Sequence, residues 1–371
     1  MSLGTCESGH LGNWKSGLIA GRPLRYDYSI MKLRVGLVGL GKAWEVRHRA
    51  ALRALSDRFE VRAVCEEVGH RARQAAEEFD AAHVDGYRAL VRRDDVDAML
   101  MLSPQWYGSL PILAACEYGK AIYCAAALDL EPDQALKIRD RVRASGVAFM
   151  AEFPRRQAPA TLRLKELMAT SLGPPTLLFG HQRLIVDTEP ADGSVRPVWH
   201  ASPMMRSLME LVDWCRYVVD AEPTSVVGVS HCHRSSQQYD EDYLMMSLDF
   251  SAVQAPSLAA TAQISCGHYM PSAWKEAVSF RPPAGLQVCC ENGVAFVDFP
   301  SRLTWFDSAG RHEESLDTER PVGELLLSHF HRAVTSLVRK TSDLEDAYQA
   351  IRIVLAAQQS CQEGQRITLD C

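Results

Sequence analysis

The sequence predicts two domains: an α/β domain with a doubly wound parallel sheet, then an α+β domain with a large, open, mostly antiparallel sheet. Three observations support this. The chain has 371 residues, enough for two ordinary domains with separate cores. Strand and helix patterns alternate over 31–155, which is typical of a parallel sheet. Beyond 156, several strand patterns follow one another without helices, which favours antiparallel pairing.

The predicted parallel sheet begins with the apolar run 33–38, which a glycine-containing turn connects to a helical pattern. A second strand at 59–65 and an alanine- and arginine-rich helix at 70–79 complete the strand–helix–strand entry. Further helix–strand pairs follow at 87–92 with 97–102, 108–118 with 121–124, and 132–145 with 147–152. This alternation places the first domain at 31–155.

The second domain, 156–371, begins with a predicted helix at 161–169. Its predicted strands are 176–185, 225–232, 243–250, 258–266 and 295–299. Two helices, 324–339 and 344–363, close the chain, and Gly364 is a plausible helix stop.

Bulk properties exclude several classes of protein. A net charge of −6 argues against a nucleic-acid binder, which needs clustered Lys and Arg. The 11 cysteines are scattered, which indicates reduced thiols rather than a disulfide framework. No apolar run is long enough to span a bilayer, and no signal-peptide pattern is present. We therefore expect a cytoplasmic protein with neither a nucleic-acid nor a membrane partner.

Residues 1–30 have no clear hydrophobic period, and a second methionine, Met31, directly precedes the first strand. We interpret 1–30 as an extension and a candidate for disorder: an arm, an added leader, or a stretch ahead of the true start.

The turn after the first strand has two of the three glycines of a dinucleotide-binding Rossmann fingerprint. Its residues are Gly39, Leu40, Gly41, Lys42, Ala43 and Trp44. The glycines permit a tight turn and let backbone N–H groups approach a pyrophosphate at the helix N-terminus. Trp44 stands where the third glycine is usual, so either the helix is pushed from the sheet or the packing differs. The alternative is a sheet of this kind that binds no dinucleotide.

Glu66 ends the second strand, 25 positions after Gly41. A carboxylate there can accept hydrogen bonds from the adenosine ribose hydroxyls and would repel a 2′-phosphate, so NAD is favoured over NADP. Arg71 and Arg73 keep NADP possible.

Several segments, taken in order, resemble the Gfo/Idh/MocA family of NAD(P)-dependent oxidoreductases. In the first half they are GLVGLGKAW, VRAVCEE, LSPQWYGSLPILAACEYGKAIYC and GVAFMAEFPRRQAP. In the second half they are LRLKELMATSLGPPTLLFG, MELVDWCRYVVDAEPTSVVG, ENGVAFVDF and AIRIVLAAQQSCQEGQRITL. The resemblance implies a substrate-binding second domain whose open sheet forms a homodimer or homotetramer interface.

The sequence departs from this family at the expected catalytic positions. Where relatives carry Glu-Lys-Pro after the fourth strand, the chain has Ala125, Ala126 and Ala127, so the lysine is absent. Where relatives carry His-x-x-Asp on a helix, it has Glu210 and Asp213. These two carboxylates are predicted to share one helical face and, if they face the cleft together, to provide an acid or base. The alternative is that they pair with arginines of the same helix, Arg206 or Arg216.

The resemblance also suggests residues that line the cofactor and substrate. Ser103, Pro104 and Gln105 match the family's cofactor-lining segment, whereas the histidine usual just beyond is Gly108. Ala125, directly after the fourth strand, is a further cofactor-binding candidate. Arg156, at the domain junction, matches a family arginine that would bind a substrate carboxylate or the cofactor, although a structural salt bridge is an equal alternative.

Two further residues are candidates because they come from second-domain segments expected to border the cleft. His181 is a candidate for catalysis and Lys275 for substrate binding. No metal site is predicted, because strand alternation sends Cys232 to the opposite face from His231 and His233.

Three functions remain open at this point. The first is an oxidoreductase that moves hydride between NAD(P) and a sugar, polyol or related small molecule, with proton transfer by Glu210, His181 or Lys275. The second is a catalytically impaired nucleotide- or sugar-binding sensor or partner subunit, favoured by the missing lysine, histidine and glycine. The third retains the cofactor and uses redox cycling for elimination or hydrolysis.

Overall fold

Two sheets organise the chain in the computed structural model, and both belong to one unit, Lys32–Cys371. The structure describes residues 32–103, 107–125, 132–186, 203–231, 242–251, 259–271, 276, 280, 284–336 and 342–369. The predicted extension at 1–30 lies outside these residues.

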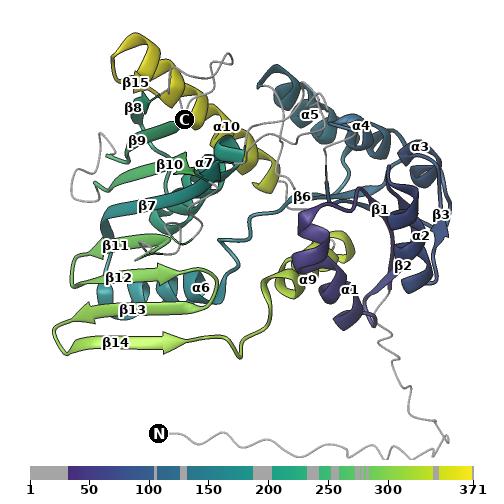
Figure 1. The fold of residues 1–371 in the computed structure, drawn as a ribbon, viewed down its shortest axis with the longest axis horizontal. Coiled ribbons are helices and arrows are strands. Elements are labelled where there is room, and N and C mark those ends of the chain that lie inside the picture. The colour runs from purple at the N-terminus through teal and green to yellow at the C-terminus, as the bar shows by residue number, and fades with distance from the viewer. Residues whose placement is uncertain are drawn as a thin grey trace, which may run out of the picture. The chain divides into compact units, whose positions relative to one another are not determined.

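The first sheet is parallel and six-stranded, in the order β3-β2-β1-β4-β5-β6 (Figure 1). Its strands are β1 (Leu33–Val38), β2 (Phe59–Cys65), β3 (Ala82–His83), β4 (Ala98–Met101), β5 (Ala121–Cys124) and β6 (Phe149–Ala151). The helical segments between them are η1 (Trp44–His48), α1 (Arg49–Ala54), α2 (Gly69–Glu78), α3 (Tyr87–Val91), α4 (Leu110–Glu117) and α5 (Pro132–Ser145). The inner strands β4 and β5 are buried along their whole length because helices cover both faces. The predicted doubly wound sheet is confirmed.

The second sheet has nine strands in the order β14-β13-β12-β11-β7-β10-β9-β8-β15. The central strands are β7 (Pro175–Val186), β8 (Ser225–His231), β9 (Tyr243–Asp249) and β10 (Thr261–Pro271). The remaining strands are β11 (Leu286–Cys290), β12 (Gly293–Asp298), β13 (Arg302–Asp307), β14 (Gly310–Ser315) and β15 (Ile367–Thr368). Every neighbouring pair is antiparallel except β7 with β10, so the prediction of a mostly antiparallel sheet is also confirmed.

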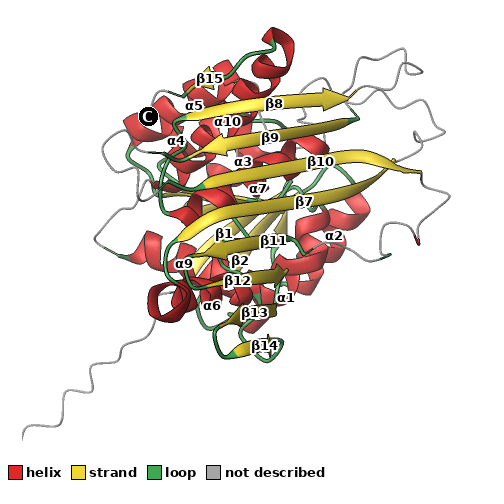
Figure 2. Ribbon diagram, turned by 90° about the vertical axis from the view of Figure 1, so that its left-hand side faces the viewer, coloured by secondary structure: helices red, strands yellow, loops and turns green. Residues whose placement is uncertain are grey.

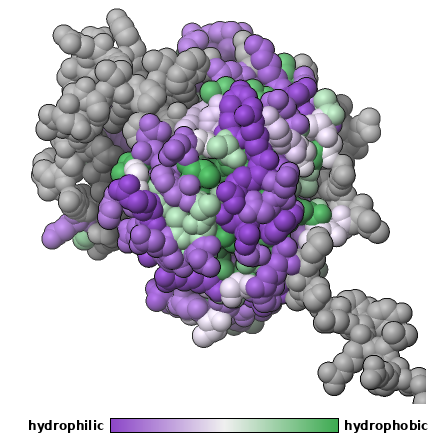
Figure 3. All heavy atoms as spheres, turned by 90° about the vertical axis from the view of Figure 1, so that its right-hand side faces the viewer, coloured by the Kyte–Doolittle hydropathy of each residue, from purple (hydrophilic) through white to green (hydrophobic). Residues whose placement is uncertain are grey.

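Helices cover one face of this second sheet and leave the other open, as Figure 2 shows. Those of this half are α6 (Pro159–Leu167), η2 (Met168–Leu172), α7 (Pro203–Val219), α9 (Val322–Thr335) and α10 (Ser342–Glu363). Buried and half-buried residues alternate along β9, as expected for a strand with one covered face. The open face carries partly exposed apolar side chains, whereas the side of the molecule in Figure 3 is mainly hydrophilic around smaller apolar areas.

Helix α9 returns from the far end of the chain to the first sheet. It packs on η1 and α1, and its Leu326, Leu327 and Phe330 join the core formed by Val35 and Leu37 of β1. The predicted domain boundary at 156 does not anticipate that this helix, near the end of the chain, packs on the first sheet. In the described parts of the chain, no helix is long and apolar enough to cross a membrane.

Candidate functional site

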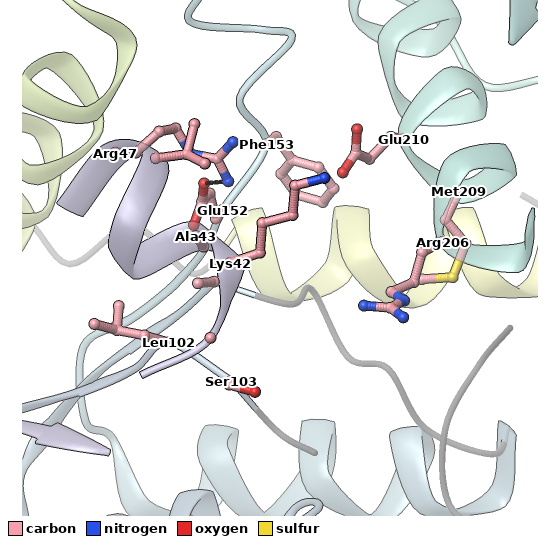
Figure 4. A pocket seen from close by; sticks show the side chains of 13 residues that line it. Lys42, Ala43, Arg47, Leu102, Ser103, Glu152, Phe153, Arg206, Met209 and Glu210 are labelled. Carbon is pink, nitrogen blue, oxygen red and sulfur yellow. Dashed lines mark ion pairs between the residues drawn. The ribbon is translucent and has the colours of Figure 1, made fainter. Parts of the chain in front are cut away.

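A cavity of about 290 Å³ lies between the carboxyl ends of the parallel strands and helix α7 (Figure 4). The parallel-sheet side contributes Gly41, Lys42, Ala43, Val46, Arg47, Leu102, Ser103, Ala125, Glu152 and Phe153. Helix α7 contributes Arg206, Met209 and Glu210. Ligands of open α/β sheets bind at this edge of the strands, because loops and helix N-termini diverge there.

The turn after β1 is held against the end of β4, which explains its two glycines. Gly39 has φ +74°, and a Cβ there would lie 2.5 Å from the Ser103 carbonyl oxygen. A Cβ on Gly41 would lie 2.8 Å from the Ser103 Cβ. Since real Cβ atoms do not tolerate such approaches, any larger residue would force the turn away from β4. Ser103 therefore borders both the turn and the cavity.

Glu66 is bound to the same turn. Its Oε2 accepts a hydrogen bond from the Leu40 N–H at 2.5 Å, and its Oε1 accepts one from the Val68 N–H at 3.3 Å. Arg71 donates a hydrogen bond to the Leu40 carbonyl oxygen. The carboxylate thus lies at the turn and fixes the conformation of the turn, and its contact with an adenosine ribose stays a prediction.

Trp44 does not line the cavity, so its assignment to the cofactor-lining set stays a prediction that the position of its side chain does not support. Its side chain is only 3% exposed and packs on Phe79, with ring centroids 5.6 Å apart. The helix takes a wider, π-type course over Trp44–His48 before continuing as α1. The bulky ring is therefore accommodated by different packing, and the turn keeps its place.

A buried charged network forms one wall of the cavity, and the sequence analysis did not single it out. Glu152, directly after β6, forms an ion pair with Arg47 of η1, and its Oε2 lies 3.2 Å from Nε2 of His48. The same Nε2 is 3.0 Å from the Tyr123 hydroxyl oxygen of β5. Burial by itself would raise the pKa of Glu152, but His48 and Arg47 outweigh it and lower that pKa. The usable signal was the position of Glu152, since it follows a parallel strand at the same edge as Ser103 and Ala125.

Glu210 is the carboxylate that α7 presents to the cavity. Its Oε2 lies 3.3 Å from Nε of Arg155, and the side chain is 43% exposed. Arg155 is itself held by Gln182 of β7, with a 2.8 Å hydrogen bond, and its guanidinium lies 5.0 Å from the Trp214 ring centroid. In Figure 4, Lys42 extends from the turn toward Glu210. Within the described residues, Lys42 makes no hydrogen bond or ion pair.

Asp213 does not share the cavity with Glu210, which corrects the predicted pair of cleft carboxylates. Its side chain is 1% exposed and accepts two hydrogen bonds from Arg156, one of them at 2.7 Å. Arg216, at 3.6 Å, lies on its other side. Burial raises the pKa of Asp213 to about 6 although both arginines oppose the shift. Such a shift often marks a catalytic group, but this one lies in a sealed ion-pair network.

Arg156 therefore belongs to that network, and its assignment as a substrate residue stays a prediction. It bridges Asp213 and Asp346 of α10, the latter at 2.7 Å, and its side chain is only 14% exposed. The structural salt bridge left open as the alternative is the arrangement observed.

His181 lies on the open face of the second sheet and does not line the cavity, so its catalytic assignment stays a prediction that this placement does not support. Its neighbour Gly180 faces Leu211 of α7, so strand alternation turns His181 the other way. Its Nδ1 is 2.7 Å from the Ser265 hydroxyl oxygen and its Nε2 is 2.9 Å from that of Tyr269. Burial lowers the pKa of His181, and the positive charge of Arg183 lowers it further.

Some predicted residues lie outside the described part of the chain: Pro104, Gln105 and Lys275. The same holds for Ala126 and for Cys232 and His233 of the metal motif considered above. Among the described residues, no cluster of His, Cys, Asp and Glu side chains is arranged to hold a metal ion.

Comparisons with known proteins agree with this arrangement. Residues 33–153 match the family model GFO_IDH_MocA, described as an oxidoreductase family with an NAD-binding Rossmann fold. An inositol 2-dehydrogenase of Acidothermus cellulolyticus is 30% identical over 201 residues, 53% of this chain and 57% of that protein. A dTDP-3,4-didehydro-2,6-dideoxy-α-D-glucose 3-reductase of Actinomadura kijaniata is 32% identical over 123 residues, 33% of this chain and 36% of that protein. The match thus spans less than two thirds of these curated relatives.

Solved structures match the fold over nearly the whole chain. A levoglucosan dehydrogenase in complex with NADH and levoglucosan has a TM-score of 0.78 at 16% identity, covering 92% of this chain and 100% of its own. An aldose–aldose oxidoreductase from Caulobacter crescentus has a TM-score of 0.77 at 15% identity, covering 91% and 100%. These similarities establish the fold. Residues 33–153 therefore match a family of oxidoreductases with an NAD-binding Rossmann fold, and the chain as a whole has the fold of these solved structures.

Proposed function

We propose that the protein is an NAD-dependent oxidoreductase that transfers hydride at a hydroxyl-bearing carbon of a sugar, polyol or related small molecule. The observation that carries this proposal is the cavity, which reaches from the glycine turn to Glu210. It thereby joins a dinucleotide-binding element to an acid–base side chain from the second domain. The names of the relatives, an inositol dehydrogenase and a sugar reductase, support the substrate class.

The residues present fit the cofactor. Gly41 and Lys42 line the cavity at the turn, where a pyrophosphate would meet the N-terminus of the first helix and the ammonium of Lys42. Glu66 would accept hydrogen bonds from the adenosine ribose, and its charge favours NAD over NADP. Ser103 and Ala125 would border the nicotinamide end. When bound, NAD⁺ supplies the acceptor for the hydride.

Glu210 is the proton acceptor in this proposal. Oxidation of an alcohol removes a proton from the hydroxyl oxygen as the carbon gives up its hydride, so a base must lie within hydrogen-bond reach of that oxygen. Glu210 lines the cavity, whereas Asp213 and His181 do not. The guanidinium of Arg155, 3.3 Å from the Glu210 carboxylate, fixes the position of that carboxylate.

The test is the Glu210→Gln variant. We expect kcat for a responsive polyol or sugar to fall by about 10²- to 10⁴-fold, because the base is lost while the shape is kept. The NADH dissociation constant, measured by fluorescence quenching, should stay unchanged. Glu166→Gln, on the exposed face of α6, is the matched control and should keep wild-type turnover. Turnover by Glu210→Gln at the wild-type rate would exclude Glu210 as the base.

A second candidate is a nucleotide- or sugar-binding protein without turnover. The charge of Glu210 is compensated by Arg155, and the chain has Ala126 at the position of the family lysine. NADH binding with no reduction of NAD⁺ across a broad panel of polyols and sugars would favour this candidate over the enzyme.

The proposal includes a homodimer or homotetramer formed through the open face of the second sheet. Leu177, Phe179, Val227 and Val229 are 36–53% exposed there, and contiguous exposed apolar side chains commonly mark a protein interface. Light scattering should give a multiple of 41.2 kDa, and a particle of 41.2 kDa would exclude the oligomer.

A further inference from the structure

We propose that the cluster of Arg47, His48 and Glu152 carries one net positive charge and thereby makes the protein bind NADH in preference to NAD⁺. This inference rests on the proposed function and goes beyond it, because it assigns to these residues the choice between the two redox states of the cofactor. Arg47 and Glu152 lie together on the wall of the cavity (Figure 4). Ser103 and Ala125, which would border the nicotinamide end, line the same cavity.

The contacts of His48 show where its protons lie. Its Nδ1 is 3.0 Å from the Ala43 carbonyl oxygen, and a carbonyl oxygen only accepts hydrogen bonds, so Nδ1 carries a proton. Its Nε2 lies 3.2 Å from Oε2 of Glu152, and both side chains are fully buried. Without a proton between them, a lone pair of Nε2 would face a carboxylate oxygen away from water, which is strongly unfavourable. His48 and Glu152 therefore share one proton.

The shared proton sets the charge of the cluster. An imidazole protonated on Nδ1 alone is neutral, so without the shared proton the negative charge of Glu152 would cancel the positive charge of Arg47. The shared proton adds one positive charge, whether His48 or Glu152 holds it. The lowered pKa of Glu152 agrees with an ionised carboxylate and a protonated imidazole.

This charge reaches the cavity with little screening. His48 and Glu152 are fully buried and the side chain of Arg47 is 26% exposed, so water and salt weaken their field less than that of a surface pair. Glu210, the other acidic side chain in the described lining, is paired with Arg155 at 3.3 Å.

The two redox states of the cofactor differ in charge at the nicotinamide ring. The ring is cationic in NAD⁺ and neutral in NADH, whereas the pyrophosphate carries the same charge in both. A net positive charge near the ring repels the cationic form and has little effect on the neutral form. Because binding then favours NADH, the hydride transfer to the bound nucleotide becomes more favourable by the same factor.

The experiment measures the dissociation constant of NAD⁺ divided by that of NADH, from NADH fluorescence and its displacement by NAD⁺. His48→Gln removes the shared proton and Arg47→Gln removes the guanidinium charge, so each brings the cluster to zero net charge. We expect each variant to lower the ratio about tenfold, the effect of one partly screened charge. Arg47→Lys keeps the charge and should keep the wild-type ratio.

Glu152→Gln separates the charge of the cluster from its packing. The amide N–H of the new side chain can donate to Nε2 of a neutral His48, so the shared proton and the carboxylate charge disappear together and the charge of Arg47 remains. The ratio should therefore stay at the wild-type value although the variant is less stable. Arg53→Gln, which removes an exposed positive charge from α1, is the matched control and should also keep the ratio.

A wild-type ratio in both His48→Gln and Arg47→Gln would overturn the inference, and this outcome does not depend on the folding of Glu152→Gln. A ratio that falls as far in Glu152→Gln as in His48→Gln would also overturn it, because packing rather than charge would then be the cause. If neither nucleotide binds to the wild type, the proposed function falls and this inference falls with it. If both bind and the ratio does not respond to charge, only this inference falls.

Discussion

At the scale of single residues, Glu66 shows how one side chain serves both the turn and the proposed ligand. Each carboxylate oxygen accepts one backbone N–H, from Leu40 and from Val68, and an oxygen of this kind has a further lone pair. The two hydrogen bonds fix the turn before any ligand binds. The remaining lone pairs would accept hydrogen bonds from the ribose hydroxyls of the proposed cofactor, so turn order and cofactor choice would then depend on the same group.

We predict that Glu66→Ala weakens NADH binding at least tenfold, because a charge-assisted hydrogen bond contributes about 1.5–3 kcal/mol. NADPH binding should suffer less, since a negative charge near the 2′-phosphate is removed. Fluorescence titration with both nucleotides measures the ratio of the dissociation constants. Glu60→Ala, at the opposite end of β2 and paired only with Arg62 in the described chain, is the control. An unchanged ratio for Glu66→Ala would show that Glu66 does not select the cofactor.

At the scale of elements, the Glu152 network joins three segments that approach the cavity from different parts of the first sheet. Arg47 and His48 come from η1, Tyr123 from β5, and Glu152 from the end of β6. The network therefore holds the first helix against the far strands. This support matters because η1 is a π-helical segment rather than a regular α-helix. The segment begins at Trp44, whose ring is buried.

The network should make the free energy of unfolding depend on pH, with lower stability at acidic pH. The folded pKa of Glu152 lies below its ordinary value of 4.5, so its ionised form stabilises the fold above that pH, and this contribution is lost as the pH falls through the folded pKa. Glu152→Gln should cost about 3 kcal/mol at pH 7, because it leaves Arg47 and His48 without their carboxylate. Urea unfolding as a function of pH measures the difference.

The difference in the free energy of unfolding between wild type and Glu152→Gln should stay constant from neutral pH down to the ordinary glutamate pKa of 4.5 and shrink as the pH falls below that value. A difference that does not change over this range would contradict the ionised network. Tyr123→Phe removes only the hydroxyl near His48 and should cost about 1 kcal/mol.

At the scale of the whole molecule, one arginine links the two halves of the chain. Arg156, at the junction after β6, binds Asp213 of α7 and Asp346 of α10. The same network includes Arg216, which pairs with Glu222. The contacts fix α7, and with it Glu210, relative to the parallel sheet, so the cavity depends on a salt bridge that does not line it.

Arg156→Gln should destabilise the protein by about 3 kcal/mol, because it leaves Asp213 buried with Arg216 alone. Chemical unfolding measures this loss of stability. The Michaelis constant of the same variant measures the effect on substrate binding separately. If Arg156→Gln kept the wild-type unfolding midpoint and lost only substrate affinity, Arg156 would belong to the binding site after all.

The sequence alone determined the layout of the first domain. The alternation of apolar strands with helices over 33–151 is a local pattern, and its parallel sheet follows from the length of each crossover. The positions of Gly39, Gly41 and Glu66 followed because strand ends in such a sheet meet at one edge. By the same rule, Ser103, Ala125 and Glu152 could be placed near one another, although only the first two were singled out.

The tertiary structure decided which side chains share the cavity. Glu210 and Asp213 lie on neighbouring positions of one helix, yet the packing of α7 exposes one and seals the other with Arg156. The sequence places His181 on a strand that is predicted to border the cleft. In the structure its side chain faces outward, because the register of the sheet fixes which face of the strand it occupies. Ion pairs such as Glu152 with Arg47 join residues about a hundred positions apart, and no local pattern encodes that contact. The sequence thus determined the two sheets and the cofactor turn, whereas the charges that line the cavity emerged only from long-range packing.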